Sequence, residues 1–151
     1  MIPPTLLLAN IKPDITVIDL GTNDIVQGVS AQNVADRLMQ GARELLSYTK
    51  VVVIMSVVPR TAGLRQQSAE EFRQKMNEVN EALKRHVSIH KDEPVIFVMQ
   101  KGFYEMVLPE GGKCEKPVHL WSSDGIHPNF EGKELYKNSL RTALCKALKK
   151  L

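Results

Sequence analysis

Two short clusters of polar residues in this sequence have types and spacing suited to chemistry. The first, Gly21-Thr22-Asn23-Asp24, directly follows a β-branched apolar stretch. The glycine permits a tight turn, after which the Asn23 amide can face a ligand and Asp24 can tie the loop down. Because Asn and Asp favour turns in general, this cluster taken alone fits an ordinary turn before a helix better than a site.

The second cluster runs from Asp124 to Asn129 and contains an aspartate and a histidine three residues apart. A carboxylate on one imidazole nitrogen fixes the tautomer of the ring and stabilises its charged form. A turn of this length can bring Asp124 and His127 together. The same residues also fit the start of a helix, with Pro128 near the first helical position and the upstream aspartate as a cap. Taken alone, the cluster leaves both interpretations open.

The elements that must position these clusters alternate along the chain. Apolar runs predict strands over residues 15–20, 51–57 and 94–99, and helical spacing predicts helices over about 30–48, 68–89 and 130–148. Ser30 is a candidate N-cap, and Ser68 with Glu71 forms a capping box. Alternating strands and helices predict a parallel sheet with helices on both faces. Ligands bind beyond the carboxyl ends of such strands, where the Gly21 cluster lies.

Composition excludes several classes of protein. The chain has 151 residues, 43% hydrophobic and 25% charged, with a net charge of +3, which fits one soluble globular domain over residues 1–151. No apolar run approaches the roughly 20 residues of a membrane span, and the charge is too small to indicate nucleic-acid binding. His86 and His90 have a metal-binding spacing but lack a carboxylate pattern, so we expect neither metal nor cofactor.

In this order and context, the two clusters resemble the conserved blocks of the SGNH (GDSL-like) hydrolase family. Gly21 to Asp24 looks like its Gly-x-Asn-Asp block, and Asp124 to Pro128 looks like its Asp-x-x-His-Pro block. The preceding Lys12-Pro13-Asp14 resembles the usual entry to the first of these. The resemblance extends over nearly the whole chain. It implies a three-layer αβα, flavodoxin-like fold and serine-based ester hydrolysis.

The resemblance also implies roles for individual residues. His127 would be the general base, Asp124 would orient its imidazole, and the Asn23 side chain would donate to the oxyanion of the tetrahedral intermediate. Gly21 and Asp24 would support the motif. An ester of a small molecule, a lipid or a carbohydrate would be the substrate.

The sequence departs from the family pattern at its start. Residues 1–20 contain no serine, and therefore no Gly-Asp-Ser block. A βαβ unit takes about 30 or more residues, so we expect an N-terminally incomplete domain whose first strand, 15–20, has an exposed edge for a partner to cover. Ser56, Ser122 and Ser123 are poor substitutes, because nothing in the sequence presents them on a strained turn beside the base.

Two functions therefore remain as expectations. The Asn23 and Asp124–His127 motifs favour a serine esterase or acyl-ester hydrolase, whereas the missing nucleophile block favours a non-catalytic αβα module that binds a partner or ligand in the cleft. A cytoplasmic location is the default for a chain with two cysteines and no signal peptide, although a missing N-terminus would remove any signal.

Overall fold

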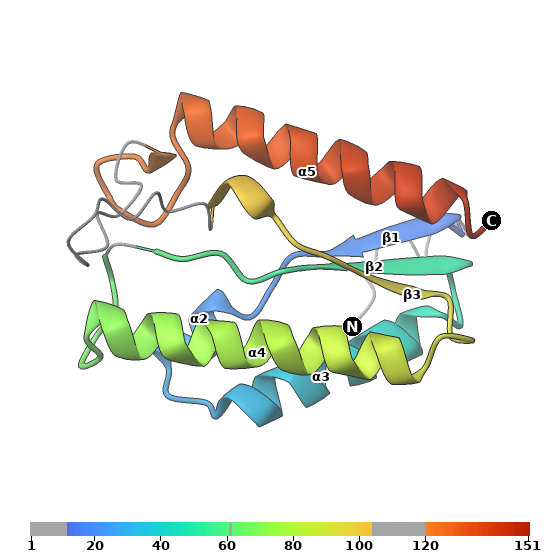
Figure 1. Cartoon of the computed structure of the whole chain (residues 1–151), viewed down its shortest axis with the longest axis horizontal. Helices are drawn as coiled ribbons and strands as arrows, with labels where there is room; N and C mark the ends of the chain where they lie inside the picture. Colours follow the sequence, from blue (N-terminus) through green and yellow to red (C-terminus); the bar gives the residue numbers. More distant parts are fainter. Residues whose placement is uncertain (1–11, 61, 104–119) are drawn as a thin grey trace, which may run out of the picture.

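A three-stranded parallel sheet forms the centre of the molecule (Figure 1). The computed structural model describes residues 12–60, 62–103 and 120–151. In these residues the strands β1 (Ile15–Ile18), β2 (Val51–Met55) and β3 (Val95–Val98) lie in the order β1-β2-β3. All five residues of β2 are buried. A continuous apolar run is typical of a parallel strand covered on both faces, and this prediction for the central strand is confirmed.

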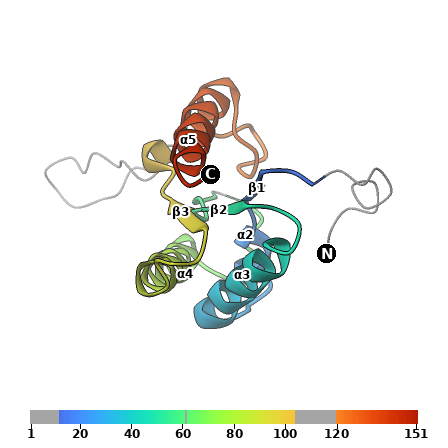
Figure 2. The same ribbon diagram turned by 90° about the vertical axis from the view of Figure 1, so that its right-hand side faces the viewer.

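Helices cover both faces of the sheet, which confirms the predicted three-layer αβα architecture. Figure 2, seen along the strands, places α3 (Ala31–Leu45) and α4 (Ala69–Ile89) below the sheet and α5 (Phe130–Leu148) above it. A short helix, α2 (Thr22–Val26), follows β1, and a 3₁₀ turn, η1 (Lys101–Phe103), follows β3. Each of the long helices was predicted from its apolar spacing, whereas α2 was not.

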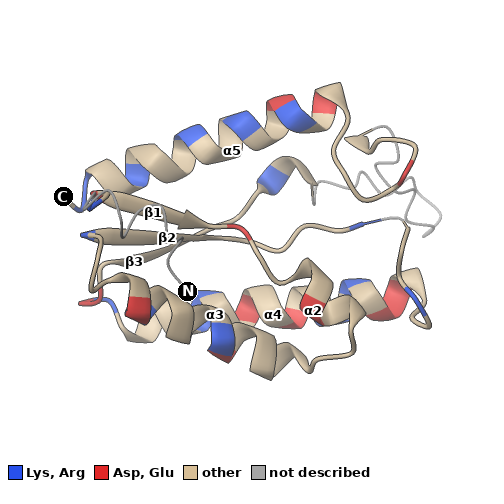
Figure 3. Ribbon diagram, turned by 180° about the vertical axis from the view of Figure 1, so that it is seen from behind, with Lys and Arg blue, Asp and Glu red and all other residues tan. Residues whose placement is uncertain are grey.

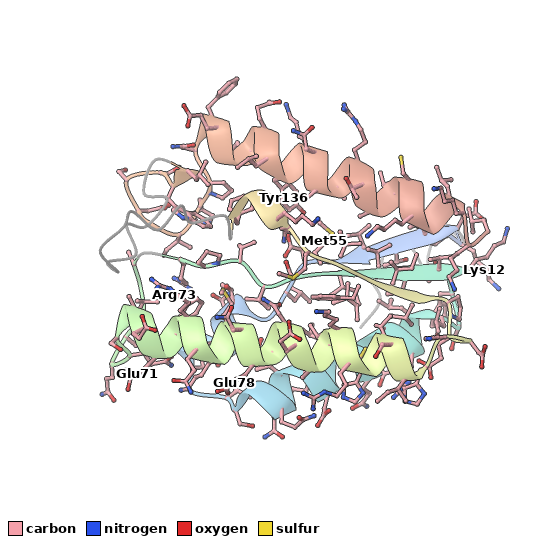
Figure 4. All side chains as sticks on the ribbon, in the orientation of Figure 1. Lys12, Met55, Glu71, Arg73, Glu78 and Tyr136 are labelled. Carbon is pink, nitrogen blue, oxygen red and sulfur yellow. The ribbon has the colours of Figure 1, made fainter. Side chains whose placement is uncertain are left out.

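The two faces of β2 supply two separate cores. Val52 and Ile54 belong to the larger core formed with α3 and α4. Val51, Val53 and Met55 belong to the smaller core, which α5 completes with Ala143 and Ala147. Successive strand side chains point to opposite faces, so one apolar run serves both layers. Figure 4 shows Met55 on the side of the sheet that faces α5.

Helix caps occur where the sequence predicts them. The Ser30 side chain accepts a hydrogen bond from the backbone N–H of Asn33, and it caps α3. At the start of α4, the Glu71 N–H donates to Ser68 Oγ at 3.1 Å, while the Ser68 N–H donates to the Glu71 carboxylate at 2.7 Å. This reciprocal pair is the predicted capping box.

The strands end earlier than predicted, and the reasons bear on the site. The first strand stops at Ile18 rather than residue 20, because Gly21 adopts a φ of 112° and turns the chain into α2. The second stops at Met55 rather than residue 57. The backbone N–H of Val57 donates to Asn80 Oδ1 at 2.8 Å, and its carbonyl accepts from Asn80 Nδ2 at 3.0 Å. A side chain of α4 thus replaces the neighbouring strand.

Charged residues of both signs are distributed over the outward surfaces of the helices (Figure 3). In the part of the chain that the structure describes, no helix is long and apolar enough to cross a membrane. Cys145 is a free, exposed cysteine on α5. The second cysteine of the sequence, Cys114, lies outside the described residues.

Candidate active site

The Gly21–Asp24 turn is built into the main core. A Cβ on Gly21 would lie 3.0 Å from Val57 Cγ2, and its φ of 112° is one that L side chains rarely adopt, so the position requires glycine. The turn opens α2, whose Ile25 and Val26 are buried. Asp24 forms an ion pair with Arg37 of α3 at 3.6 Å. The carboxylate therefore ties the turn to the neighbouring helix, which leaves Asn23 to face the cleft.

Asp124 and His127 form a hydrogen-bonded pair at the second motif. Asp124 Oδ2 lies 2.7 Å from His127 Nδ1. The other oxygen, Oδ1, accepts from the backbone N–H groups of His127 at 2.9 Å and Ile126 at 2.8 Å. The hydrogen bonds from the backbone and ring of His127, and then from Ile126, hold the pKa of Asp124 well below its usual range. A carboxylate at Asp124 favours a proton on Nδ1 and leaves the Nε2 lone pair as the acceptor.

The surrounding turn is closed by its own backbone. The Ser122 N–H donates to the His127 carbonyl at 2.8 Å, and the Asn129 N–H donates to the Leu120 carbonyl at 2.9 Å. The helix-start interpretation of Asp124 is wrong, because the N-cap of α5 is Asn129, whose side chain accepts from the Gly132 N–H. The His127 side chain is 75% exposed, so its ring projects from the turn into solvent.

A pocket of about 270 Å³ lies between the two motifs. Its walls are the end of β1 with the Asn23 turn, the segment after β2, and the indole and alkyl side chains of Trp121 and Ile126. Asp124 and His127 are not among the lining residues; the neighbouring Ile126 is. Trp121 is buried, with its ring centroid 5.6 Å from that of Phe103, and it also borders the pocket. It therefore anchors its loop and shapes the cleft.

Arg60 lies between the two motifs, and sequence reasoning missed it. Its Nη1 donates to Asn23 Oδ1 at 3.3 Å and its Nε donates to the Ala62 carbonyl at 2.9 Å. The Ala62 N–H in turn donates to the Gly125 carbonyl at 3.2 Å, in the turn that holds His127. Burial lowers the pKa of Arg60, and the charge of Asp124 opposes that shift. A single arginine after a proline carries no local signal of this long-range contact.

The carboxyl group of Asp19 also borders this pocket. Asp19, at the end of β1, is exposed where it lines the pocket, but the protein packed around it raises its pKa by desolvation. Hydrogen bonds from Tyr136 and Gln100 act in the opposite direction. Burial and then the charge of Asp19 raise the pKa of Tyr136, which Figure 4 places on the side of α5 that faces the sheet.

The three alternative serines have different surroundings. Ser56 is fully buried; its Oγ accepts from the Gln100 N–H at 3.0 Å, and its carbonyl accepts from Gln100 Nε2 at 2.8 Å. It does not line the pocket. Ser122 and Ser123 lie on the His127 turn, where Ser122 uses its backbone groups to close that turn. The two histidines near the end of α4 lie beside carboxylates: His86 Nε2 is 3.3 Å from Asp36 Oδ1, and His90 Nδ1 is 4.0 Å from Glu93 Oε1. Within the described ranges, no group of three or more potential ligands could hold a metal ion.

Solved structures share this fold. An acetylxylan esterase from Geobacillus stearothermophilus is 21% identical with a TM-score of 0.63, and the match covers 89% of this chain and 60% of that one. A GDSL-like lipase from Bacteroides thetaiotaomicron VPI-5482 is 22% identical with a TM-score of 0.69, and the match covers 93% of this chain and 66% of that one. A protein of Bacteroides fragilis NCTC 9343 assigned as an acylhydrolase is 22% identical with a TM-score of 0.70, at 93% and 65% coverage. The chain thus spans about two-thirds or less of the length of these structures.

At these identities the solved structures show the fold alone. No curated protein matches the sequence significantly. The family model for GDSL-like lipases and acylhydrolases matches residues 2–135, which is most of the chain and includes both motifs. The chain belongs to the GDSL-like lipase/acylhydrolase family.

Proposed function

We propose that this chain carries the base and oxyanion parts of an acyl-ester hydrolase. The observation that carries the proposal is the 2.7 Å contact between Asp124 and His127, in which two backbone N–H groups hold the carboxylate in place. His127 Nε2 takes a proton from the attacking hydroxyl and later gives it to the leaving alcohol, while Asp124 stabilises the charged ring between these steps. Asn23 donates to the carbonyl oxygen as that oxygen becomes negative.

The pocket supports a small acyl or alcohol group as the part of the substrate bound there. Its volume of about 270 Å³ is slightly below the usual range of ligand sites, which runs from about 300 to 1,000 Å³. Val57, Val58 and Trp121 give it apolar walls, and Asn23 and Arg60 give it donors. Related structures include an acetylxylan esterase and a lipase, so carbohydrate and lipid esters both belong to the proposed substrate class.

The nucleophile is the open part of this proposal. Residues 1–20 contain no serine, and the burial of Ser56 argues against its use. A water molecule activated by His127 would also cleave an activated ester, with a lower rate than an acyl-enzyme route. Among the described residues that line the pocket there is no serine or cysteine, and this favours the second candidate function, a non-catalytic module that binds a ligand in the same cleft.

Hydrolysis of p-nitrophenyl acetate, with intact-mass analysis after a fluorophosphonate probe, tests the proposal. His127→Ala should remove nearly all of the rate and any adduct, and Asn23→Ala should lower the rate by about 10²–10³-fold, the usual effect of one oxyanion donor. His90→Ala is the matched control for the general reactivity of an exposed imidazole, because His90 ends α4 beside Glu93.

Equal, small losses from the two site variants would contradict the assigned roles. A protein that forms no adduct and shows no turnover above the His127→Ala background would support the binding module instead. Titration with a non-hydrolysable acetyl ester analogue, followed through the Trp121 fluorescence, would then report on occupation of the pocket.

A further inference from the structure

Arg60 makes the contact that fixes how the Asn23 amide is turned. A guanidinium has only hydrogen-bond donors, so an amide can meet it only through its oxygen. The 3.3 Å contact from Arg60 Nη1 to Asn23 Oδ1 therefore decides between the two possible orientations of this amide. With Oδ1 held, the two N–H groups of Nδ2 are presented on the opposite side, away from the arginine.

The arginine is itself held rigidly. It is 9% exposed, and its Nε donates to the Ala62 carbonyl at 2.9 Å. Gly63 packs against it so closely that a Cβ there would lie 2.5 Å from Arg60 Nη2 and 3.1 Å from Ile126 Cδ1. The long side chain thus has little rotational freedom left to lose when it binds Asn23, which is the condition for an effective positioning group.

The same segment is bonded to the His127 turn. The Ala62 N–H donates to the Gly125 carbonyl at 3.2 Å, and Ile126 borders both Gly63 and the pocket. Arg60 therefore contacts the Asn23 turn directly and the Asp124–His127 turn through its own loop. The two motifs lie about a hundred residues apart in the sequence, and this loop is a physical connection between them.

The positive charge of Arg60 adds to its effect on the orientation of the Asn23 amide. At 3.3 Å the contact is longer than a typical charge-assisted hydrogen bond, but the positive charge beside Oδ1 still polarises the amide so that the opposite N–H groups become better donors. We infer that Arg60 is a positioning residue that orients and polarises the Asn23 amide toward an oxyanion while it holds the His127 turn in register with it. The inference rests on the proposed function for its catalytic meaning, but the orientation of the amide can be measured independently.

Nuclear magnetic resonance gives a readout that does not depend on activity. In the ¹⁵N-labelled chain, the side-chain NH₂ signals of Asn23 are identified by their loss in Asn23→Ala. Arg60→Met should move these signals toward solvent-exposed values and increase their mobility, and Arg60→Lys, which keeps the charge but not the planar fork, should have an intermediate effect. Arg43→Met is the matched control, because Arg43 binds Glu93 at 3.1 Å and has no contact with Asn23 among the described hydrogen bonds.

A double-mutant cycle tests the catalytic part. Arg60→Met should lower kcat by about 10- to 100-fold, the range expected when a reacting group is misplaced by about 1 Å. In the Asn23→Ala background the same change should cost less than about threefold, because the two residues act as one unit. Arg43→Met should leave the rate unchanged in both backgrounds.

The outcomes separate this inference from the proposed function. Unchanged Asn23 signals in folded Arg60→Met, or equal rate losses in both backgrounds, would overturn the inference and leave the hydrolase proposal standing. Moved signals in a chain without turnover would support the inference and contradict the hydrolase proposal. If Arg60→Met loses the dispersed amide spectrum of a folded protein, Gly63→Ala is used instead, because its Cβ must displace the Arg60 guanidinium. Gly63→Ala should move the same Asn23 signals. Unmoved signals in this variant would overturn the inference.

Discussion

The two turns that form the candidate site are held in place by different means. The Gly21–Asp24 turn is fixed by the core: its glycine abuts Val57, Val34 and Leu38, and the Ile25 side chain that follows is fully buried. The turn from Ser122 to His127 is fixed by local hydrogen bonds, since Asp124 accepts from two backbone N–H groups and from the imidazole while its side chain stays exposed.

Because they are held differently, the two turns suit different roles in the site. An oxyanion donor must occupy one position relative to the reacting carbonyl, and a group embedded in the core keeps that position. A base that takes a proton from one group and returns it to another needs an unobstructed ring nitrogen, and the exposed imidazole of His127, held by Asp124, leaves room for a substrate there. The consequence is that damage to the first turn should unfold the domain, whereas damage to the second should stay local.

Gly21→Ala should produce the largest effect. Strain at a positive φ costs roughly 1–3 kcal/mol, and the close approach to Val57 adds an overpacking cost of a similar size, so the free energy of unfolding should fall by about 3 kcal/mol. Urea denaturation followed by circular dichroism measures the change. Gly28→Ala is the control, because Gly28 has a φ of 83° but nothing within 4 Å of its Cβ position; it should cost about 1 kcal/mol. Equal losses would show that packing at Gly21 is irrelevant.

Gly132→Ala should affect the second turn at its base. A Cβ there would lie 2.3 Å from the Leu120 carbonyl oxygen and 2.8 Å from Pro128 Cβ. Overpacking of about 1–3 kcal/mol exceeds the gain of about 1 kcal/mol from alanine in a helix, so a net loss of about 1 kcal/mol is expected. The amide signals of Ile126 and His127 should move while those of Asn23 remain. Gly41→Ala, with open space at the Cβ, should instead stabilise the chain; a loss there would invalidate this reasoning.

Asp19→Asn should change how stability depends on pH. The pKa of Asp19 is raised in the folded state, so its contribution to stability is fully present below the unfolded pKa of about 3.9 and is lost as the pH rises through the folded value. The asparagine variant should therefore gain melting temperature relative to the parent chain near pH 7 and lose that advantage near pH 4. The pKa of Tyr136 should also fall, as ultraviolet titration would show, because the carboxylate that raises it is gone.

Acidification to a pH at which ordinary carboxylates are already protonated should leave the Asp124 turn intact. Because the pKa of Asp124 is lowered, its hydrogen bonds are present above the unfolded value of about 3.9 and are lost only as the pH falls through a lower folded value. The Ile126 amide proton shift should thus stay constant as the pH falls through about 4, where an ordinary aspartate titrates, and in Asp124→Asn it should differ from the parent value while the melting transition hardly moves. A shift that follows the ordinary aspartate range would contradict the local hydrogen-bond account.

Sequence patterns predicted the features that depend on neighbouring residues. The β2 run, the capping box of Ser68 and Glu71, and the bounds of α5 all follow from local periodicity or capping. The Asp124–His127 contact was predicted as a hypothesis because three residues in a turn restrict where two side chains can point. The position of Arg60 could not be predicted, since its bond to Asn23 joins residues 37 positions apart and depends on how β1 and β2 are aligned. The short α2 was missed because its Asn23 and Asp24 favour turns.

The two hydrogen bonds between Asn80 and Val57 bear on the wall of the pocket, because that wall continues from Val57. The Asn80 amide pairs with both backbone groups of Val57, much as a peptide group of an adjacent strand would. These two hydrogen bonds are made to main-chain groups, so they do not depend on the side chains of Val58 and Pro59 in the segment that follows β2. A substitution at Val58 or Pro59, which both line the pocket, should therefore change the shape of its wall while these two hydrogen bonds continue to anchor the segment. The shape of this wall and its attachment to the fold thus depend on different groups: side chains for the first and main chain for the second.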